Sequence, residues 1–297
     1  MTTETTVLQD RFELTRVHIL ESIVEGCLHN GRQLFTALAT DDALSDAAVY
    51  HEVFDLNDLM ETLDSIASDL RDHGSVPLIH IEAHGSHTGL QLASGDLVPW
   101  PIFLEAVRAI NRASRFNTLL YLAACQTEWI LASIRTLEPA PFAGCMLYHG
   151  DVRAGEIADN LAPFYTSLFT GCNIQQALAA AATAAGTKED TSRLQFWSAQ
   201  YFFVRAFAEY IRRRGDNTSL LHRAADVAAA AGHSMELDTI FRIKSDILAN
   251  HKELFMKHRA AFFLYDLIPA NRERFQTPFH LVELLLSDHQ TDGGDSR

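Results

Sequence analysis

Apolar and polar residues alternate along the first two thirds of the chain in a way that predicts strands separated by helices. Apolar runs of strand length recur at residues 17–23, 48–54, 76–83, 118–124 and 142–149. A sixth is expected within 198–207. Amphipathic segments fall between the runs, which is typical of a parallel sheet with helical crossovers. We therefore predict an α/β fold with a predominantly parallel sheet of about six strands and helices on both faces.

The segments between the predicted strands show helical spacing or turn residues. Residues 31–40, 56–74 and 99–112 are the expected helices. In the second of them, apolar side chains recur every three or four residues, at Leu56, Leu59, Leu63, Ile66 and Leu70. Residues 89–98 contain a central Ser-Gly-Asp and therefore predict a small hairpin beside the third strand.

The pattern changes after residue 214. From 215 to 288 the apolar residues keep helical spacing, with breaks at Gly232, Pro269 and Pro278 that separate about three or four helices. Polar residues and glycines fill 289–297, which we expect to be a disordered tail. The sequence thus predicts a sheet domain at 1–214, a helical C-terminal domain at 215–288 and the tail.

Charge and cysteine content exclude several classes of protein. The 297 residues carry a formal charge of −14, which argues against a nucleic-acid partner because phosphate binding needs a concentrated basic surface. None of the four cysteines forms a CxxC pair, which favours a reducing cytosol over a disulfide framework or a zinc finger. Cys145 and Cys172 fit core or helix packing. We see no secretory apolar core and no apolar run of about 18 residues, so we expect a cytoplasmic protein without a membrane partner.

Two predicted strands end on residues that carry chemistry. One apolar run is followed by His84 and Gly85, and the next candidate strand is followed by Cys125. Because the carboxyl ends of parallel strands border the crevice where sites form, adjacent strands would bring His84 and Cys125 together. A thiol titrates near about pH 8.5 and becomes a better nucleophile when an imidazole takes its proton. Gly85 leaves room for a substrate carbonyl, and its N–H can serve as an oxyanion donor.

This conjunction resembles the caspase-like cysteine peptidases: caspases, metacaspases, legumain, separase and the bacterial CHAT domains. The caspase signature Gln-Ala-Cys-[Arg/Gln/Gly]-Gly, with a histidine about 50 residues upstream, is met at Ala124, Cys125 and Gln126 and missed at Ala123 and Thr127. The CHAT branch is most similar because a downstream segment also matches it, at Phe164, Tyr165, Leu168, Gly171, Ala177 and Leu178. The resemblance covers roughly residues 15–210 and does not extend to the C-terminal helices.

The resemblance implies a role for each of these residues. His84 would be the general base and Cys125 the nucleophile, and the backbone amides of Gly85 and Cys125 would form the oxyanion hole. The implied reaction is peptide-bond hydrolysis through a thioester, with no metal or other cofactor. Relatives often carry a glycine two residues after the nucleophile, where this chain has Thr127. This departure leaves a catalytically inactive adaptor or regulatory subunit open as an alternative.

Substrate preference is expected to depend on charged residues after the strand at 142–149. Family members that cut after Arg or Lys place a carboxylate at the bottom of the primary pocket. Asp151 is the first candidate for this role, with Glu156 and Asp159 behind it. Asp151 also precedes a helical pattern, and a helix N-cap is the competing interpretation, which the commonness of Asp at N-caps favours. Arg153 could instead supply a basic pocket for a peptide cut after Asp.

A metal-dependent hydrolase is a further alternative. Its candidate ligands are His80, Glu82, His84, His87 and His149. The first three point to the same side of a strand because side chains alternate along it. The competing interpretation is a hydrogen-bonded His80–Glu82 pair that faces a helix. His149 also fits a pocket wall or a capping position.

The residues and the resemblance together predict a cytoplasmic cysteine endopeptidase of the CHAT type, and the resemblance alone implies that it is bacterial. Its expected substrate is a specific protein partner, cleaved after a basic residue. CHAT-type proteases resemble one another in acting under the control of a sensor, often in antiviral defence or cell-death pathways. A sensor or activator protein is therefore an expected partner, and the helices of residues 215–288 are the expected docking or autoinhibitory element.

Overall fold

The computed structural model describes residues 12–148, 154–171, 173–185, 194–215, 217–230, 232–233 and 236–291. The chain folds into two compact units. The first comprises Met1–Ile134 and Ala140–Ala199, and the second comprises Arg135–Pro139 and Gln200–Arg297. The sheet belongs to the first unit, whereas the described secondary structure of the second unit is helical.

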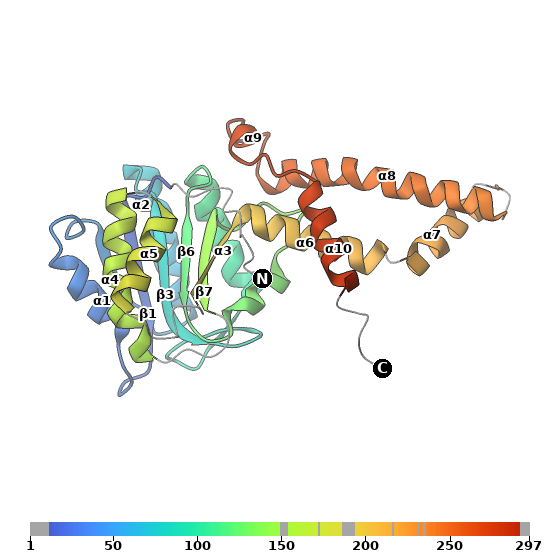
Figure 1. Cartoon of the computed structure of the whole chain (residues 1–297). Helices are drawn as coiled ribbons and strands as arrows, with labels where there is room; N and C mark the ends of the chain where they lie inside the picture. The colour runs from blue at the N-terminus through green and yellow to red at the C-terminus, as the bar shows by residue number, and fades with distance from the viewer. Residues whose placement is uncertain are drawn as a thin grey trace. The chain divides into compact units, whose positions relative to one another are not determined.

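The first unit alternates strands and helices, as Figure 1 shows. In chain order its elements are β1 (Arg16–Ser22), α1 (Asn30–Ala39), β2 (Ala48–Glu52), α2 (Leu56–His73), β3 (Pro77–Gly85), β4 (Gly89–Gln91), β5 (Leu97–Pro99), α3 (Trp100–Ala113), β6 (Leu119–Ala123), the 3-10 helix η1 (Thr127–Ser133), β7 (Gly144–Tyr148), α4 (Ala154–Gly171), α5 (Ile174–Ala185) and β8 (Leu194–Ser198). The expected α/β class is therefore confirmed.

The main sheet has the strand order β2-β1-β3-β6-β7-β8. Neighbouring strands are parallel except for β8, which pairs antiparallel with β7. The predicted hairpin is confirmed as β4 and β5, and β4 pairs antiparallel with the end of β3. Gly95 has a φ of +93° in its turn, a conformation that glycine adopts without strain. The mostly parallel sheet of about six strands is thus confirmed, with the hairpin as an addition at one end.

Helices cover both faces of this sheet (Figure 1). Helix α1 packs against α4, and α4 packs against α5, whereas α2 packs against α3. Strand β6 is buried along its whole length, as expected for a strand covered on both sides. Strand β3 is buried from Pro77 to Ala83, and exposure begins at His84. The apolar run of β3 therefore ends at the edge of the core.

Helix α2 begins and ends where its sequence provides caps. The side chain of Asp55 accepts a hydrogen bond of 3.0 Å from the backbone N–H of Asp58, an N-cap arrangement. At the other end Gly74 is left-handed with a φ of 70°, and its N–H donates to the carbonyl of Leu70. Between the caps, an apolar stripe faces the sheet with Leu59, Leu63, Ile66 and Leu70 buried. The helical spacing predicted for 56–74 is confirmed.

The sixth strand was predicted too late in the chain. Strand β8 covers Leu194–Ser198, and the stretch 198–207 is almost entirely helical, because α6 begins at Ala199. Phe203, Phe207 and Ile211 recur every four residues and are buried, so they form one face of a helix. The apolar run was mistaken for a strand because short apolar segments look alike in both structures.

The second unit contains α6 (Ala199–Gly215), α7 (Asn217–Ala230), α8 (Leu237–Phe262), α9 (Asn271–Arg274) and α10 (His280–Thr291). An aromatic cluster fills its core, because the ring of Phe203 contacts those of Phe207, Phe255, Phe262 and Phe263. The hydroxyl of Thr136 lies 2.7 Å from Nδ1 of His258, which fixes the segment Arg135–Pro139 to this unit.

The division between the units differs from the one that composition suggested. The compact units separate at Ala199 and Gln200, earlier than the predicted boundary after residue 214, because the apolar face of α6 packs in the second unit. The beginning of the predicted tail is helical, since α10 extends to Thr291. Residues 292–297 lie outside the described part of the chain.

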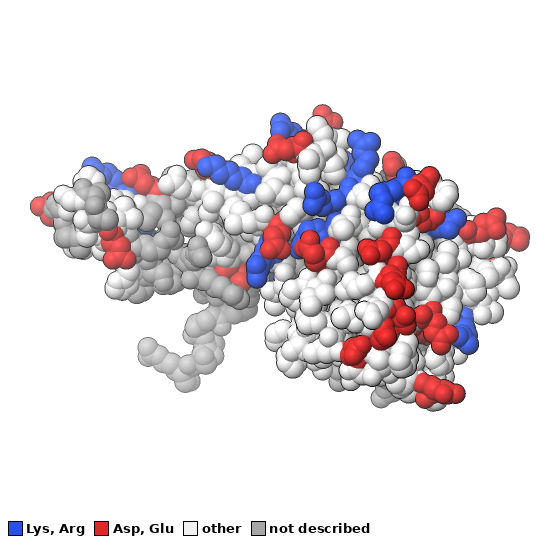
Figure 2. Space-filling view, turned by 180° about the vertical axis from the view of Figure 1, so that it is seen from behind, with Lys and Arg blue, Asp and Glu red and all other residues white. Residues whose placement is uncertain are grey.

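Charged side chains of both signs are mixed on the side of the first unit seen in Figure 2. On that side, Lys and Arg are interspersed with Asp and Glu and form no continuous basic surface. The expectation that nucleic acid is not a partner stays a prediction. Among the described residues, none of the helices combines the length and the apolar character needed to cross a membrane.

Candidate active site

The predicted pair of strand ends is adjacent in the sheet. Strands β3 and β6 are parallel neighbours, with Glu82 opposite Ala123 at the end of their register. His84 lies two residues after Glu82, near the end of β3, and Cys125 lies two residues after Ala123, in the turn that follows β6. Core burial also stops at these two positions, because Ala83 and Ala124 are buried while His84 is exposed and Cys125 is half-buried. Both side chains therefore lie at the carboxyl edge of the sheet.

Gly85 packs directly against the backbone of Cys125. A Cβ placed on Gly85 would lie 2.1 Å from the carbonyl oxygen of Cys125 and 3.1 Å from the Cβ of Ala124. Real Cβ atoms do not approach backbone oxygens so closely, so only glycine fits at this position. The ends of β3 and β6 are thus in contact through backbone atoms, which fixes the spacing between the two segments that carry His84 and Cys125.

The turn that follows Gly85 is held by several hydrogen bonds. The backbone N–H of Ser86 donates to the carbonyl of Gly89 at 2.9 Å, and the hydroxyl of Ser86 donates to the same carbonyl at 3.0 Å. The carbonyl of Ser86 accepts a bond of 3.1 Å from Nε1 of Trp100, a residue that is 1% exposed. His87 and Thr88 form the tip of this turn. The segment after His84 is therefore anchored to the core of the unit.

The chain turns sharply immediately after Cys125. Gln126 has a φ of 55° and a ψ of 29°, a left-handed conformation that is uncommon for residues other than glycine and costs roughly 1–2 kcal/mol. The next residue, Thr127, is fully buried and begins η1. The position where caspase-like peptidases often carry glycine is therefore occupied here by a buried residue, whose side chain does not fill the solvent side of the site.

Cys145, within the sheet, and Cys125, in the turn after β6, differ in accessibility. Cys145 in β7 is fully buried, and this burial raises the pKa of its thiol well above the ordinary value. The packing role expected for Cys145 is confirmed, because a thiol in such surroundings is unreactive. Cys125 is half-buried and stands at the sheet edge. Of these two thiols, only Cys125 is accessible to a substrate.

The residues expected to determine cleavage preference lie at or near the limits of the described chain. Asp151 and Arg153, together with His149 and Cys172, fall outside the described residues. Glu156 and Asp159 lie in the first turns of α4, and the placement of their side chains is not described. The expectation of a carboxylate pocket therefore stays a prediction.

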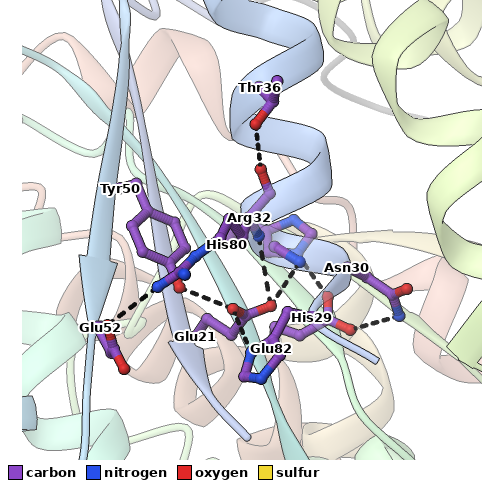
Figure 3. A network of polar contacts seen from close by, with 10 residues as sticks. Glu21, His29, Asn30, Arg32, Thr36, Tyr50, Glu52, His80 and Glu82 are labelled. Carbon is purple, nitrogen blue, oxygen red and sulfur yellow. Dashed lines mark hydrogen bonds and ion pairs between the residues drawn. The ribbon is translucent and has the colours of Figure 1, made fainter. Parts of the chain in front are cut away.

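Two of the residues proposed as metal ligands, His80 and Glu82, are engaged in hydrogen bonds (Figure 3). Nδ1 of His80 lies 2.6 Å from the hydroxyl of Tyr165, and Nε2 lies 3.3 Å from the carboxylate of Glu82. Asn30 donates a bond of 2.8 Å to the other oxygen of Glu82. One neutral tautomer of His80, protonated at Nε2, satisfies both of its contacts.

This pairing favours the structural interpretation of the His80–Glu82 pair over the metal site. Both residues are buried, whereas His84 is exposed. Within the described residues, no group of three or more histidine, cysteine or carboxylate side chains is arranged to hold a metal ion. The buried pair connects β3 to α4 through Tyr165 and to α1 through Asn30.

A second buried carboxylate, Glu21, was not singled out in the sequence. It lies opposite Glu82 in the register of β1 and β3. Its Oε1 accepts a hydrogen bond of 2.7 Å from the N–H of Gly31. Its Oε2 accepts one of 2.9 Å from the ring of His29 and one of 2.7 Å from the hydroxyl of Tyr50 (Figure 3). Its acidic side chain in the middle of the apolar run VHILESI was the available clue, because buried acids are rare unless they are paired.

An aromatic contact beside the candidate dyad was also missed. The rings of His87 and Trp129 meet edge to face, with centroids 6.3 Å apart. His87 follows His84 by three residues and Trp129 follows Cys125 by four, so the contact joins the two segments that carry the dyad. Sequence spacing alone could not reveal it, because the pairing depends on how β3 and β6 align.

No protein-family model matches this chain, and no curated protein matches it at a significant level of sequence similarity.

Proposed function

We propose that the protein is a cysteine endopeptidase of the caspase-like type, with His84 and Cys125 as its catalytic dyad. His84 accepts the proton of the Cys125 thiol, and the thiolate attacks the carbonyl carbon of the scissile peptide bond. The tetrahedral intermediate collapses to a thioester as His84 protonates the leaving amine. Water then hydrolyses the thioester with His84 again acting as base, which releases the acid and restores the thiol.

The observation that carries this proposal is the contact between Gly85 and the backbone of Cys125. It supports a fixed distance between the segments bearing the base and the nucleophile, because a side chain at position 85 would separate them. The left-handed Gln126 supports the same interpretation, since strained backbone next to a reactive side chain is characteristic of functional sites.

The hydrogen-bond alternation of the hairpin supports Gly85 as an oxyanion donor. Ser86 and Gly89 form a hydrogen-bonded pair, so Gly85 and Leu90 form the following pair without mutual hydrogen bonds. This alternation directs the N–H of Gly85 away from β4, and the backbone of Cys125 lies beside Gly85. In the proposed mechanism this N–H and that of Cys125 stabilise the oxyanion.

The proposed substrate is a protein cleaved after a basic residue. The formal charge of −14 favours attraction of a basic peptide, and the acidic residues Glu156 and Asp159 lie in the helix that follows β7. Within the same proposal, the helices of the second unit are the element that receives a sensor or activator protein. Antiviral defence or cell death is the proposed setting, on the resemblance to CHAT proteases alone.

The proposed activity is tested by intact mass spectrometry after incubation with an arginyl acyloxymethylketone. A single adduct on the wild-type protein that is missing from Cys125→Ala is the expected result. An adduct with an aspartyl probe only would support the peptidase activity and change the proposed preference from a basic to an acidic residue before the cleaved bond. No adduct with either probe would contradict the activity and favour the inactive adaptor.

A further inference from the structure

We infer that Trp129, supported by His87, forms a subsite for a large apolar side chain of the substrate peptide, within about three residues of the scissile bond. This inference deepens the proposed peptidase function and rests on it. Trp129 is 50% exposed, although Thr127 and Ile130 in the same 3-10 helix are fully buried. The core therefore holds η1 in place while the indole remains available to a ligand.

The position of the indole relative to the thiol makes it reachable by a bound peptide. A 3-10 helix rises about 2.0 Å per residue and one further Cα–Cα step spans about 3.8 Å, so Trp129 stands within roughly 10 Å of Cys125 along the chain. An extended peptide advances about 3.3 Å per residue, so roughly three residues cover that distance. A peptide with its scissile carbonyl at Cys125 therefore brings a neighbouring side chain to the indole.

The two aromatic residues are supported by rigid segments. His87 lies at the tip of the turn fixed by Ser86 and Trp100, and Trp129 donates its backbone N–H to the carbonyl of Gln126 at 3.3 Å. The ring of His87 packs against that of Trp129 at an interplanar angle of 72°. Such support fixes the orientation of the indole before a peptide arrives, which lowers the entropic cost of binding.

The surroundings favour an apolar occupant. Four more exposed apolar residues follow the ends of β1 and β2 or lie on the hairpin: Val24, Leu28, Phe54 and Leu97. The hairpin lies beside these strand ends, because Ala93 donates its N–H to the hydroxyl of Ser22 and Ser94 donates its N–H to the carbonyl of Phe54. The edge that bears the candidate dyad thus also exposes apolar side chains at the ends of β1 and β2 and on the hairpin.

Binding of uncleaved peptides to Cys125→Ala tests the subsite without requiring turnover. The probes are blocked hexapeptides with a central Arg–Ala bond, in which Phe, Leu, Ser or Lys is placed in turn at each other position. At one position or more, Phe and Leu should bind roughly tenfold more tightly than Ser or Lys. Trp129→Ala should reduce this preference to about twofold or less, whereas Trp129→Phe should retain most of it.

Two controls exclude general effects of removing a side chain. Leu267→Ala removes an exposed apolar residue from the second unit and should leave the preference intact. His87→Ala should weaken the preference only partly, because it removes the support and leaves the indole. Circular dichroism of each variant checks that the fold is retained.

The outcomes for the subsite and for the peptidase are separable. Peptides that bind without an apolar preference, a preference for Lys, a preference that survives Trp129→Ala, or no binding at all would each overturn the subsite. Adduct formation at Cys125 of the wild-type protein is measured independently. An apolar preference together with an unreactive Cys125 would keep the subsite and reject the peptidase. A reactive Cys125 without an apolar preference would keep the peptidase and reject the subsite.

Discussion

At the scale of single residues, Gly85 carries the strictest structural requirement of the candidate site. Its Cα lies against the carbonyl of Cys125, so the smallest possible side chain already collides with backbone atoms. Backbone atoms cannot rotate out of the way as the end of a side chain can. The contact therefore links the identity of one residue to the geometry of the dyad.

We predict that Gly85→Ala separates the ends of β3 and β6. The added methyl group should lower the free energy of unfolding by about 1–3 kcal/mol, as overpacked sites do. It should also abolish labelling of Cys125 by the arginyl probe under conditions where the protein is folded. Urea denaturation and intact mass spectrometry measure the two effects.

Gly144→Ala is the matched control for this variant. A Cβ there would lie 2.6 Å from the ring of Phe196, so the substitution also crowds the sheet, but at β7 and β8. It should destabilise the protein and leave labelling of Cys125 in place. Equal labelling of Gly85→Ala and the wild type would contradict the role given to Gly85.

His18 makes stability depend on pH. Burial, and then the neighbouring His51, lowers the pKa of His18 to about 4, and its Nε2 has no hydrogen-bond partner among the described residues. The unfolded chain, with an ordinary histidine pKa of about 6.5, binds the proton more readily. Stability from this residue is therefore complete above about pH 6.5 and is lost as the pH falls toward 4.

We predict that protonation of His18 lowers the free energy of unfolding by about 2–3 kcal/mol between about pH 7 and pH 4.5. His18→Leu, which cannot take up a proton, should lack this part of the decrease. Urea denaturation of both proteins across this pH range measures the difference. Parallel stability curves for the two proteins would show that His18 is not buried in its neutral form.

The residues of the site were predictable to different degrees. His84 and Cys125 stand out because each follows an apolar run of the sequence, and Gly85 because it follows His84; their roles stay predictions. The left-handed conformation of Gln126 could not, because glutamine has no preference for it and the turn is imposed by β6 and η1. The contact of His87 with Trp129 likewise depends on alignment across the sheet.

At the scale of elements, the beginning of helix α1 is tied to the sheet by Glu21. This carboxylate accepts hydrogen bonds from the N–H of Gly31, at the first turn of the helix, and from the hydroxyl of Tyr50. Burial, and then the hydrogen bond to Glu21, raises the pKa of Tyr50 to about 12, so this hydroxyl stays a donor. A carboxylate at a helix N-terminus is also stabilised by the helix dipole. Glu21 thus joins β1, β2 and α1.

We predict that Glu21→Gln lowers the free energy of unfolding by about 1–3 kcal/mol, because an amide cannot accept all of these bonds. The control is Glu52→Gln, which removes the neighbouring carboxylate of β2. Glu52 is exposed and forms a surface ion pair with Arg32, so its substitution should change stability by about 0.5 kcal/mol or less. Equal effects of the two substitutions in urea denaturation would contradict the role of Glu21.

Most elements of the first unit followed from sequence patterns. The alternation of apolar runs and helical segments located β1, β2, β3, β6 and β7. In β3 and β6 the run is almost continuously apolar because the strand is covered on both faces. The stretch 198–207 was assigned to the wrong structure because its apolar residues serve a helix whose partner, the cluster around Phe255, comes much later in the chain. Local patterns do not contain that information.

At the scale of the whole molecule, the candidate site belongs to the first unit alone. His84, Gly85, Cys125 and Trp129, with the hydrogen bonds that fix their segments, all lie within Met1–Ile134. The second unit has its own aromatic core around Phe203. Nothing in the geometry of the dyad therefore requires the second unit.

We predict that a chain ending at Ala199 folds and keeps a reactive Cys125. Alkylation of Cys125 in this fragment should still depend on His84, as judged by comparison with the same fragment carrying His84→Ala. A higher rate in the fragment than in the full chain would support an autoinhibitory second unit. A folded fragment that has lost the dependence on His84 would contradict a site contained in the first unit.

The most direct test of the account is the rate at which iodoacetamide alkylates Cys125, measured against pH. At about pH 7 the wild-type protein should react roughly tenfold or more faster than His84→Ala, because the imidazole takes the thiol proton. At about pH 10, where an ordinary thiol is ionised, the rates should converge. His73→Ala, which removes an exposed histidine from α2, should follow the wild type. Equal rates for the wild type and His84→Ala at about pH 7 would contradict the dyad.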